Sequence, residues 1–205
     1  MRALVRLFFG MLIANLVVGC YNNNDANSIQ PNRIIDSSGE VVTTKDLPTR
    51  LISLGPSNTE ILFALDARDL IVGVDDFSDY PPDTKTIEKV GAPFPSFDLE
   101  RIVSFEPDLV ISTELAEFNA TLKDVGIPVY VSNPQNIEEV LTTINDIGRL
   151  IGLTDNAINL SNQMRSRISV VRELTSNAAP TKVFYEVDAS DPTRPYTVGA
   201  PSFVN

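Results

Sequence analysis

RLISLGPSNTE, the sequence of residues 50–60, has the pattern that decides the fold class of this chain. The short apolar run at its start predicts a buried β-strand, and the Gly-Pro pair ends that strand. Over residues 58–65 the apolar side chains recur at helical spacing, and Ser57 or Asn58 can cap the helix that they predict. A buried strand that turns tightly into a helix is typical of a parallel α/β sheet.

The same alternation of short apolar runs and helical patterns continues to residue 151. It predicts further strands at residues 70–74, 109–111 and 129–131, and helices at residues 98–105, 118–125 and 136–151. Short strands that are nearly all apolar, with helices between them, indicate a parallel sheet with helices on both faces. We therefore predict that residues 50–153 form an α/β lobe.

Three further segments flank this lobe. Residues 20–49 are interpreted as a polar tether followed by two short strands around a Ser-Gly turn. Residues 154–177 contain neither Gly nor Pro and predict one long helix of about 36 Å at 1.5 Å per residue. Residues 178–205 begin a new strand at Lys182–Val187, which we interpret as the start of a truncated second α/β lobe.

The composition excludes several classes of function. The 205 residues include 27 acidic and 16 basic side chains, a net charge of −11. A nucleic-acid partner is not expected, because binding would require Lys and Arg to neutralise phosphates. The chain contains no His, which excludes a Ser-His-Asp triad, a Cys-His dyad and a His-ligated zinc site. We expect no metal, no resident cofactor and no enzyme activity.

Residues 1–19 have the pattern of a secretory signal. Arg2 and Arg6 precede an apolar run at residues 7–18, which is shorter than the roughly 20 apolar residues of a membrane span. The single Cys of the chain, Cys20, follows at once. This arrangement resembles the bacterial lipobox, in which the chain is cut before a Cys that carries lipid. We favour lipidation, which predicts an extracytoplasmic protein anchored to the membrane through Cys20. The alternative is a plain secretory signal followed by an incidental Cys.

Beyond these patterns, residues 50–60 resemble the first strand-turn-helix of class III periplasmic binding proteins, the receptors of ABC importers for corrinoids, iron-siderophores and haem. Residues 72–82, 89–91 and 98–110 match the same family in the same order, and the Ser-Asp-Tyr-Pro-Pro segment looks most like vitamin B12 receptors. The resemblance implies two α/β lobes joined by a long helix, with the ligand in the cleft between them. Most of the second lobe is missing here, although residues 195–203 resemble the cleft loop that opens it.

The candidate ligand-binding residues follow from the carboxyl ends of the predicted strands, where open α/β sheets bind ligands. Aromatic rings with a few polar groups suit the flat face of a corrin or porphyrin. By resemblance to B12 receptors, Phe77 and Phe94 match aromatic contacts, whereas Thr113 stands where another aromatic is common. The candidates are Pro56, Ser57, Asn58, Phe77, Tyr80, Phe94, Thr113 and Glu114.

Several of these residues have an alternative, structural role. Pro56 could only end a strand, Ser57 only cap a helix, and Tyr80 only brace its loop. Phe97 is expected to pack beneath the following helix rather than contact a ligand. The acidic residues of the nearby loop are expected to be solvated and to repel a trianionic ferric catecholate; they are Asp75, Asp76, Asp79 and Asp83.

Two further positions are singled out by the resemblance. Glu100 matches the glutamate that the first lobe presents to arginines of the permease, although a first-turn glutamate is also favoured by the helix dipole. Asp66 follows the first helix where the family commonly has Gly in a left-handed conformation. We expect a small loss of stability there and no change of fold.

These observations favour a receptor that delivers a corrinoid to an ABC importer, and the alternative ligand is an iron-siderophore or haem. A zinc or manganese receptor is disfavoured by the absence of His. An extracytoplasmic hydrolase is a remote alternative, because Ser57 has no His to activate it and no GxSxG motif, although Glu60 and Glu114 could form an acid-base pair. The sequence offers no positive sign of a non-transporting adhesive lipoprotein.

Overall fold

The computed structural model describes residues 32–179, 181–188, 190, 193 and 196–197. The predicted signal, Cys20 and most of the tether therefore lie outside the described residues, as does most of the 195–203 loop. No helix among the described residues combines the length and the apolar character that a membrane crossing requires.

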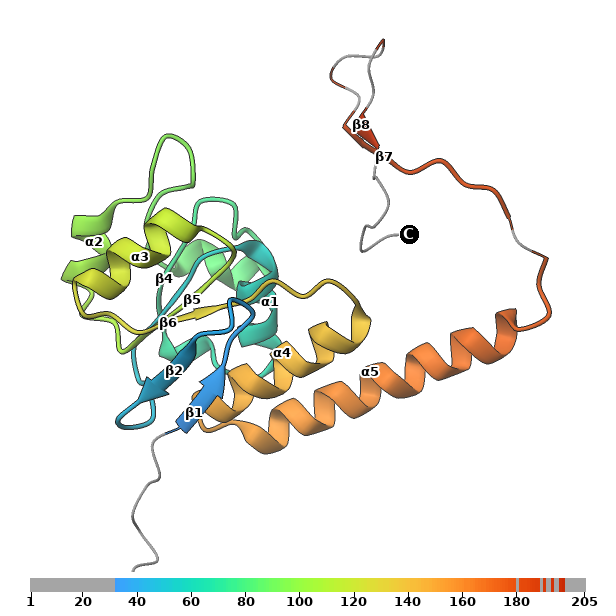
Figure 1. Cartoon of the computed structure of the whole chain (residues 1–205), viewed down its shortest axis with the longest axis horizontal. Helices are drawn as coiled ribbons and strands as arrows, with labels where there is room; N and C mark the ends of the chain where they lie inside the picture. Colours follow the sequence, from blue (N-terminus) through green and yellow to red (C-terminus); the bar gives the residue numbers. More distant parts are fainter. Residues whose placement is uncertain (1–31, 180, 189, 191–192, 194–195, 198–205) are drawn as a thin grey trace, which may run out of the picture. The chain divides into compact units, whose positions relative to one another are not determined.

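A parallel four-stranded sheet forms the centre of the described lobe, as predicted (Figure 1). Its strands are β3 (Leu51–Ser53), β4 (Ile71–Val74), β5 (Leu109–Ser112) and β6 (Val129–Val131), in the order β4-β3-β5-β6. All three pairings are parallel. The strands are buried on both faces, which explains why their sequences are apolar without alternation.

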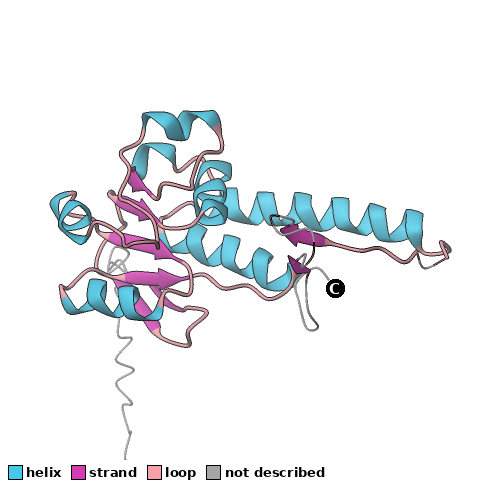
Figure 2. Cartoon of the chain, turned by 90° about the horizontal axis from the view of Figure 1, so that it is seen from above, coloured by secondary structure: helices cyan, strands magenta, loops and turns pink. Residues whose placement is uncertain are grey.

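Helices cover both faces of this sheet (Figure 2). The elements are α1 (Pro56–Ala64), α2 (Leu99–Ser104), α3 (Ala116–Asp124) and α4 (Ile137–Leu150), with short 3-10 turns at η1 (Arg68–Leu70) and η2 (Pro82–Thr86). One core cluster joins strand residues such as Leu109 to Leu62 of α1 and Ile147 of α4. The other joins Val110 to Ile102 of α2 and Leu122 of α3. This arrangement confirms the predicted fold class.

A β-hairpin precedes the lobe at β1 (Asn32–Ile35) and β2 (Val41–Thr44), with the expected turn at Ser38-Gly39. Asp36 attaches the hairpin to the edge of the sheet. Its carboxylate accepts the backbone N–H of Val131 at 3.1 Å, and the N–H of Ser37 donates to the Val131 carbonyl at 3.0 Å. The hairpin therefore protects part of the open edge of β6.

Helix α5 (Thr154–Thr175) is the long helix that the sequence predicts. It lies along α4, and the two helices are tightly packed at Gly148, where an added Cβ would stand 2.3 Å from the Ala157 Cβ. Leu160 and Met164 pack partly against the core, whereas Val171 is exposed. The apolar side chains of α5 that pack on the lobe therefore lie in the first half of the helix.

The last described strands are β7 (Glu186–Asp188) and β8 (Tyr196–Thr197), which pair antiparallel. The predicted strand at residues 182–187 is wrong in its bounds, because residues 182–185 are not in a strand. A strand requires a hydrogen-bonded neighbour, and in the described part of this segment only β8 supplies one. The apolar run at 183–185 therefore marked the right region but not the right residues.

Candidate functional site

The loops after the four parallel strands meet at one edge of the sheet, because parallel strands all end on the same side. Residues 54–57 follow β3, residues 75–82 follow β4, residues 113–115 follow β5 and residues 132–136 follow β6. Seven of the eight predicted ligand-binding residues lie in three of these loops or in the first turn of α1. Tyr80 belongs to the second loop, and Phe94 lies in a separate loop described below.

The first loop turns at Gly55, whose φ of +114° suits only glycine. A Cβ at this position would come within 2.7 Å of the Thr113 side chain, so the loops after β3 and β5 touch here. Helix α1 begins at Pro56, and neither Ser57 nor Asn58 caps it, which corrects the sequence expectation. Proline is favoured at the first helical position because its φ is already helical and it lacks an N–H.

Pro56 and Ser57 are exposed, but Asn58 is fully buried. The Asn58 side chain donates to the Leu54 carbonyl at 3.1 Å, while its Oδ1 has no hydrogen-bond partner. This placement does not match the expected direct contact with a ligand, since no surface of the side chain is accessible. Asn58 instead supports the turn from beneath.

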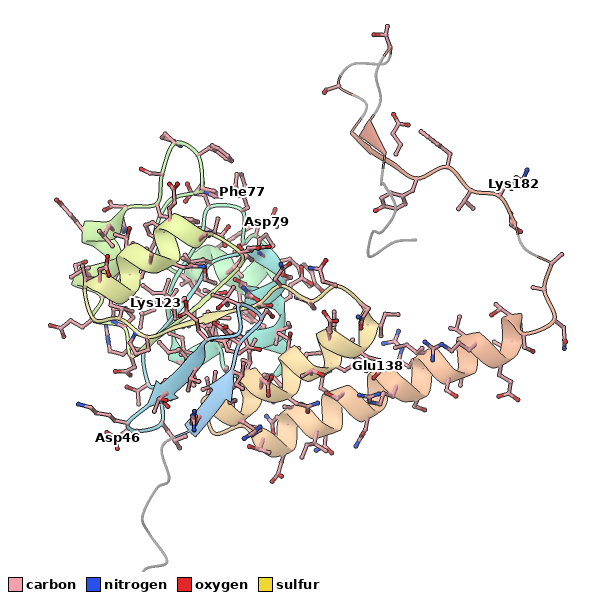
Figure 3. All side chains as sticks on the ribbon, in the orientation of Figure 1. Asp46, Phe77, Asp79, Lys123, Glu138 and Lys182 are labelled. Carbon is pink, nitrogen blue, oxygen red and sulfur yellow. The ribbon has the colours of Figure 1, made fainter. Side chains whose placement is uncertain are left out.

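Three predicted aromatic residues are exposed, with Phe77 at 59%, Tyr80 at 62% and Phe94 at 85%. Phe77 and Tyr80 lie in the loop after β4, and Figure 3 labels Phe77 with its neighbour Asp79. The loop that carries Phe94 runs beside them, because the N–H of Asp76 donates to the Gly91 carbonyl at 2.9 Å. The fold therefore collects aromatic surface at the same edge as the Gly55 turn.

Phe97 and Asp75 are buried, unlike the exposed aromatic and acidic residues of the same loops. Phe97 is buried against Phe118 with ring centroids 4.9 Å apart, as expected for a packing residue. Asp75 is only 1% exposed, so the expectation that it is solvated is wrong. Its carboxylate is satisfied by backbone N–H groups of its own and the neighbouring loop. Asp76, Asp79 and Asp83 are exposed as expected.

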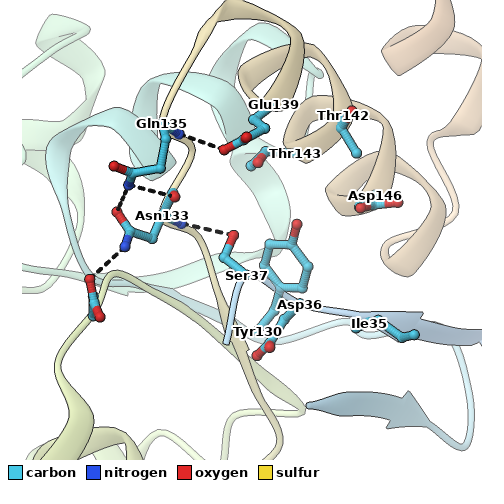
Figure 4. A pocket seen from close by; sticks show the side chains of 11 residues that line it. Ile35, Asp36, Ser37, Tyr130, Asn133, Gln135, Glu139, Thr142, Thr143 and Asp146 are labelled. Carbon is cyan, nitrogen blue, oxygen red and sulfur yellow. Dashed lines mark hydrogen bonds between the residues drawn. The ribbon is translucent and has the colours of Figure 1, made fainter. Parts of the chain in front are cut away.

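A hollow of about 670 Å³ lies between the loops after β5 and β6 and helix α4 (Figure 4). Asn133 is its central polar residue, because its side chain donates to Glu114 and its backbone N–H donates to Ser37 Oγ at 3.0 Å. Of the predicted site residues, only Glu114 lines this hollow. The lining residues are Ile35, Asp36, Ser37, Glu114, Tyr130, Asn133, Gln135, Glu139, Thr142, Thr143 and Asp146.

Burial changes the acid-base behaviour of two residues that line the hollow. It raises the pKa of the Asp146 carboxyl, and the nearby Arg149 opposes that increase only partly. It also raises the pKa of the Tyr130 hydroxyl, to which the negative charge of Asp146 contributes. The hollow therefore offers oxygen acceptors and amide groups in a setting that disfavours additional negative charge.

Sequence reasoning missed Asn133 and Gln135, although a signal for them existed. They follow the fourth strand, just as Thr113 and Glu114 follow the third, and the same rule on carboxyl ends selects both pairs. Ser37 carried no such signal, because the hairpin reaches the hollow only through tertiary contacts with β6.

Glu100 is exposed in the first turn of α2. The side chain of Asp98 caps this helix by accepting the Arg101 N–H at 2.9 Å, and Arg101 forms an ion pair with Glu88. The ion pair and the cap fix the neighbours of Glu100 and leave its own carboxylate toward solvent. A first-turn acidic residue is consistent with the helix dipole and also with docking to a cationic partner.

A family model for periplasmic binding protein matches residues 51–203. The chain is 34% identical to the uncharacterized ABC transporter substrate-binding lipoprotein YvrC of Bacillus subtilis, over 95% of this chain and 66% of that protein. It is 28% identical to the vitamin B12-binding protein of Yersinia pestis (strain Pestoides F), over 67% of this chain and 50% of that protein.

Among solved structures, the fold matches a possible iron-binding (periplasmic solute-binding) protein from Staphylococcus epidermidis. The TM-score is 0.65 at 30% identity, over 78% of this chain and 64% of that chain. The chain thus spans about half to two-thirds of the length of these relatives. The matched residues include the sheet, the loops at its carboxyl edge and α5, and the chain therefore belongs to the periplasmic binding protein family.

Proposed function

We propose that the protein is the substrate-binding lipoprotein of an ABC importer and captures a corrinoid of the cobalamin type. One observation carries the ligand class: Phe77, Tyr80 and Phe94 are all more than half exposed, on adjoining loops at the carboxyl edge of the sheet. Exposed aromatic surface gathered in one place is costly in water and marks a binding site. Relatives named as substrate-binding and vitamin B12-binding proteins support a binding role rather than an enzyme.

The polar groups beside the aromatic loops fit the same kind of ligand. A corrin has an apolar face for ring stacking and a rim of amides, which can pair with hydroxyl, carboxylate and amide groups. Ser57 and Glu114 are exposed near that surface, and Asn133 extends it toward β6. We therefore propose Pro56, Ser57 and Phe77, with Tyr80, Phe94, Thr113 and Glu114, as the contacts from this lobe.

The charge of the surface argues against one class of iron chelate. Asp76, Asp79 and Asp83 are exposed on the loop after β4, and the next basic side chain along it is Lys85. A trianionic ferric catecholate would meet repulsion at this loop, whereas a neutral corrinoid or hydroxamate complex would not. The charge thus disfavours a trianionic ferric catecholate and leaves the corrinoid and the hydroxamate complexes as compatible ligands.

Two-dimensional ¹⁵N NMR of the chain, titrated separately with cyanocobalamin, cobinamide, ferrichrome and haemin, tests this proposal residue by residue. We expect both corrinoids to shift the amide resonances of Ser57, Phe77 and Thr113 while leaving those of α3 unchanged. Shifts with ferrichrome or haemin alone would contradict the corrinoid assignment and favour the alternative ligands. An absence of shifts with all four would contradict the proposed site.

A receptor for an iron-siderophore or haem is the second candidate. It is favoured by the structural match to a possible iron-binding protein at 30% identity, which is higher than the identity to the vitamin B12-binding protein. Aromatic contacts suit a porphyrin as well as a corrin. A neutral ferric hydroxamate would also be compatible with the acidic loop.

Two partner contacts complete the proposal. Glu100, exposed on α2, would dock to arginines of the permease, so Glu100→Arg should abolish ligand uptake in cells while leaving ligand binding unchanged. Equal uptake by this variant and the unmodified protein would exclude the contact. Glu117→Arg on α3 is a matched control, since Glu117 is also an exposed first-turn acid.

Cys20 would carry the lipid that anchors the protein to the membrane. The named lipoprotein relative supports this proposal. The expected outcome is that cells incorporate labelled palmitate into the protein and that Cys20→Ser removes the label. Incorporation that persists in Cys20→Ser would contradict the assignment.

A further inference from the structure

A buried row of polar side chains joins the Gly55 turn to the loop that carries Phe77. Ser53, Thr59 and Ser78 are fully buried, and Asp75 is 1% exposed. The Ser53 and Thr59 hydroxyls are 2.8 Å apart, and the Thr59 and Ser78 hydroxyls are also 2.8 Å apart. The row ends where Ser78 Oγ donates to the Asp75 carboxylate at 2.5 Å. It therefore runs from β3, through α1, to the loop after β4.

The Asp75 carboxylate binds the backbone of both loops at once. Its Oδ2 accepts the N–H of Gly55 at 2.7 Å, immediately before the exposed Pro56. Its Oδ1 accepts the N–H of Phe77 at 2.9 Å. One buried side chain thus fixes the two points from which proposed ligand contacts emerge.

The hydroxyl groups can form this row in one direction. Each hydroxyl has a single hydrogen to donate. Because Ser78 donates to Asp75, it must accept from Thr59, and Thr59 must then accept from Ser53. Each side-chain oxygen of the row has a partner, and a fully satisfied buried network holds its members in one arrangement.

Lys89 holds the same loop from its other side. Its ammonium donates to the carbonyls of Asp75 at 3.0 Å and Ser78 at 2.6 Å. The strand-like segment around Lys89 is itself bonded to the end of β4, because the Val90 N–H donates to the Val74 carbonyl at 3.0 Å. This segment continues into the loop that carries Phe94, so the fixed backbone reaches the base of that loop at Gly91, whose carbonyl accepts the Asp76 N–H at 2.9 Å.

We propose that Asp75 is a positioning residue for ligand capture, acting with Ser78, Thr59 and Lys89. Together they hold the backbone at Pro56 and Phe77 in the binding geometry before a ligand arrives. A loop that is already ordered loses less conformational freedom on binding, which favours affinity. This inference depends on the proposed function only for what the loops bind, since the rigidity of the loops belongs to the ligand-free protein.

Asp75→Asn tests the role directly, because an amide keeps the shape but cannot accept all three hydrogen bonds. Asp108, at the opposite edge of the sheet, is a matched control. Its carboxylate also accepts three hydrogen bonds, from the N–H and hydroxyl of Thr49 and from the N–H of Arg50. Thr59→Val interrupts the row with almost no change in volume, and Thr59→Ser restores the hydroxyl.

The first measurement is amide hydrogen exchange of the ligand-free chain by NMR. In Asp75→Asn we expect exchange at the Gly55 and Phe77 amides to accelerate by roughly tenfold or more, because each amide loses a hydrogen bond to a buried charge. The amide of Val110, in the core of the sheet, should stay protected. Asp108→Asn should accelerate Thr49 and Arg50 and leave Phe77 unchanged. Thr59→Val should accelerate Phe77 exchange and Thr59→Ser should not.

The second measurement is the affinity of the same variants for cyanocobalamin. Asp75→Asn and Thr59→Val should bind more weakly, by roughly tenfold for Asp75→Asn, whereas Asp108→Asn and Thr59→Ser should match the unmodified chain. The inference is overturned if Phe77 exchange is unchanged in Asp75→Asn, or if all amides accelerate equally. If the unmodified chain does not bind cyanocobalamin, the proposed function fails, while the exchange data still decide the positioning role.

Discussion

Aspartate residues in three different surroundings show how backbone geometry and burial act on single side chains of this lobe. Asp66 has a left-handed backbone, with a φ of +61°, just after α1. Asp146 lies half-buried on α4 with its charge only partly balanced by Arg149. Asp75 is buried and fully hydrogen bonded. Asp66 and Asp146 each lower the stability of the fold by a small amount. Asp75 instead holds the two loops of the proposed site.

Replacing Asp66 by glycine should stabilise the protein. The Asp66 N–H donates to the Phe63 carbonyl, and the left-handed turn that this bond closes is strained for a residue with a Cβ. We expect the free energy of unfolding of Asp66→Gly to rise by about 1 kcal/mol, the lower end of the cost of a left-handed backbone, because Asp tolerates this conformation better than most residues. Urea denaturation measures this change. Asp66→Ala, which keeps the Cβ, should show no gain, and a gain equal to that of glycine would contradict the explanation.

Replacing Asp146 by asparagine should stabilise the protein at neutral pH. Burial raises the pKa of the Asp146 carboxyl above its ordinary 3.8, so the folded state disfavours the ionised form. This cost is present above the raised pKa and disappears as the pH falls below the ordinary value. We expect Asp146→Asn to gain about 1 kcal/mol or less at pH 7. The gain should vanish near pH 3, and a constant or growing difference at low pH would show that charge is not the cause.

At the scale of elements, the contact between α4 and α5 is the main support of the long helix. The two helices come together at Gly148 and Ala157, and Ser161 is buried farther along the same line. Beyond Ile168 the described residues of α5 are exposed, including Val170, Val171 and Leu174. The first half of α5 is therefore held by packing, whereas the second half packs little on the described part of the lobe and pairs with α4 through Arg165 and Glu138.

Gly148→Ala should separate the two helices and destabilise the protein. Alanine favours helix over glycine by about 1 kcal/mol at an exposed position, but the new Cβ would stand 2.3 Å from the Ala157 Cβ. We expect a net loss of about 1–3 kcal/mol in the free energy of unfolding, measured by urea denaturation. Ser166→Ala, on the exposed part of α5, is the control and should be neutral. A stabilised Gly148→Ala variant would show that the contact is not tight.

The elements of the lobe were largely predictable, because hydrophobic periodicity depends on local spacing. The four parallel strands, the helices over residues 98–151 and the long helix follow from such patterns. The site was less predictable. The strand ends located its loops, but the burial of Asp75 depends on a tertiary contact, because its carboxylate accepts the N–H of Gly55, 20 residues away. The start of α1 was also missed, because Pro56 and Gly55 outweighed the capping preference of Ser57.

At the scale of the whole molecule, the residues that stabilise the described lobe lie apart from the residues proposed to bind the ligand. Two apolar clusters lie on the two faces of the sheet, and the polar and aromatic loops lie at its carboxyl edge. Loops at this edge can therefore vary in sequence with little effect on the core. Since the chain spans about half to two-thirds of its relatives, the contacts discussed here are those that this single lobe contributes.

The most direct test of the account is the affinity of the protein for cyanocobalamin, measured by isothermal titration calorimetry with and without Phe77. If the aromatic loops bind the ligand, Phe77→Ala should weaken binding by about tenfold without changing the free energy of unfolding, as expected for removal of an exposed ring from a binding surface. Val125→Ala, an exposed apolar change at the end of α3, should bind like the unmodified chain. Equal affinities for Phe77→Ala and the unmodified chain would contradict the central claim.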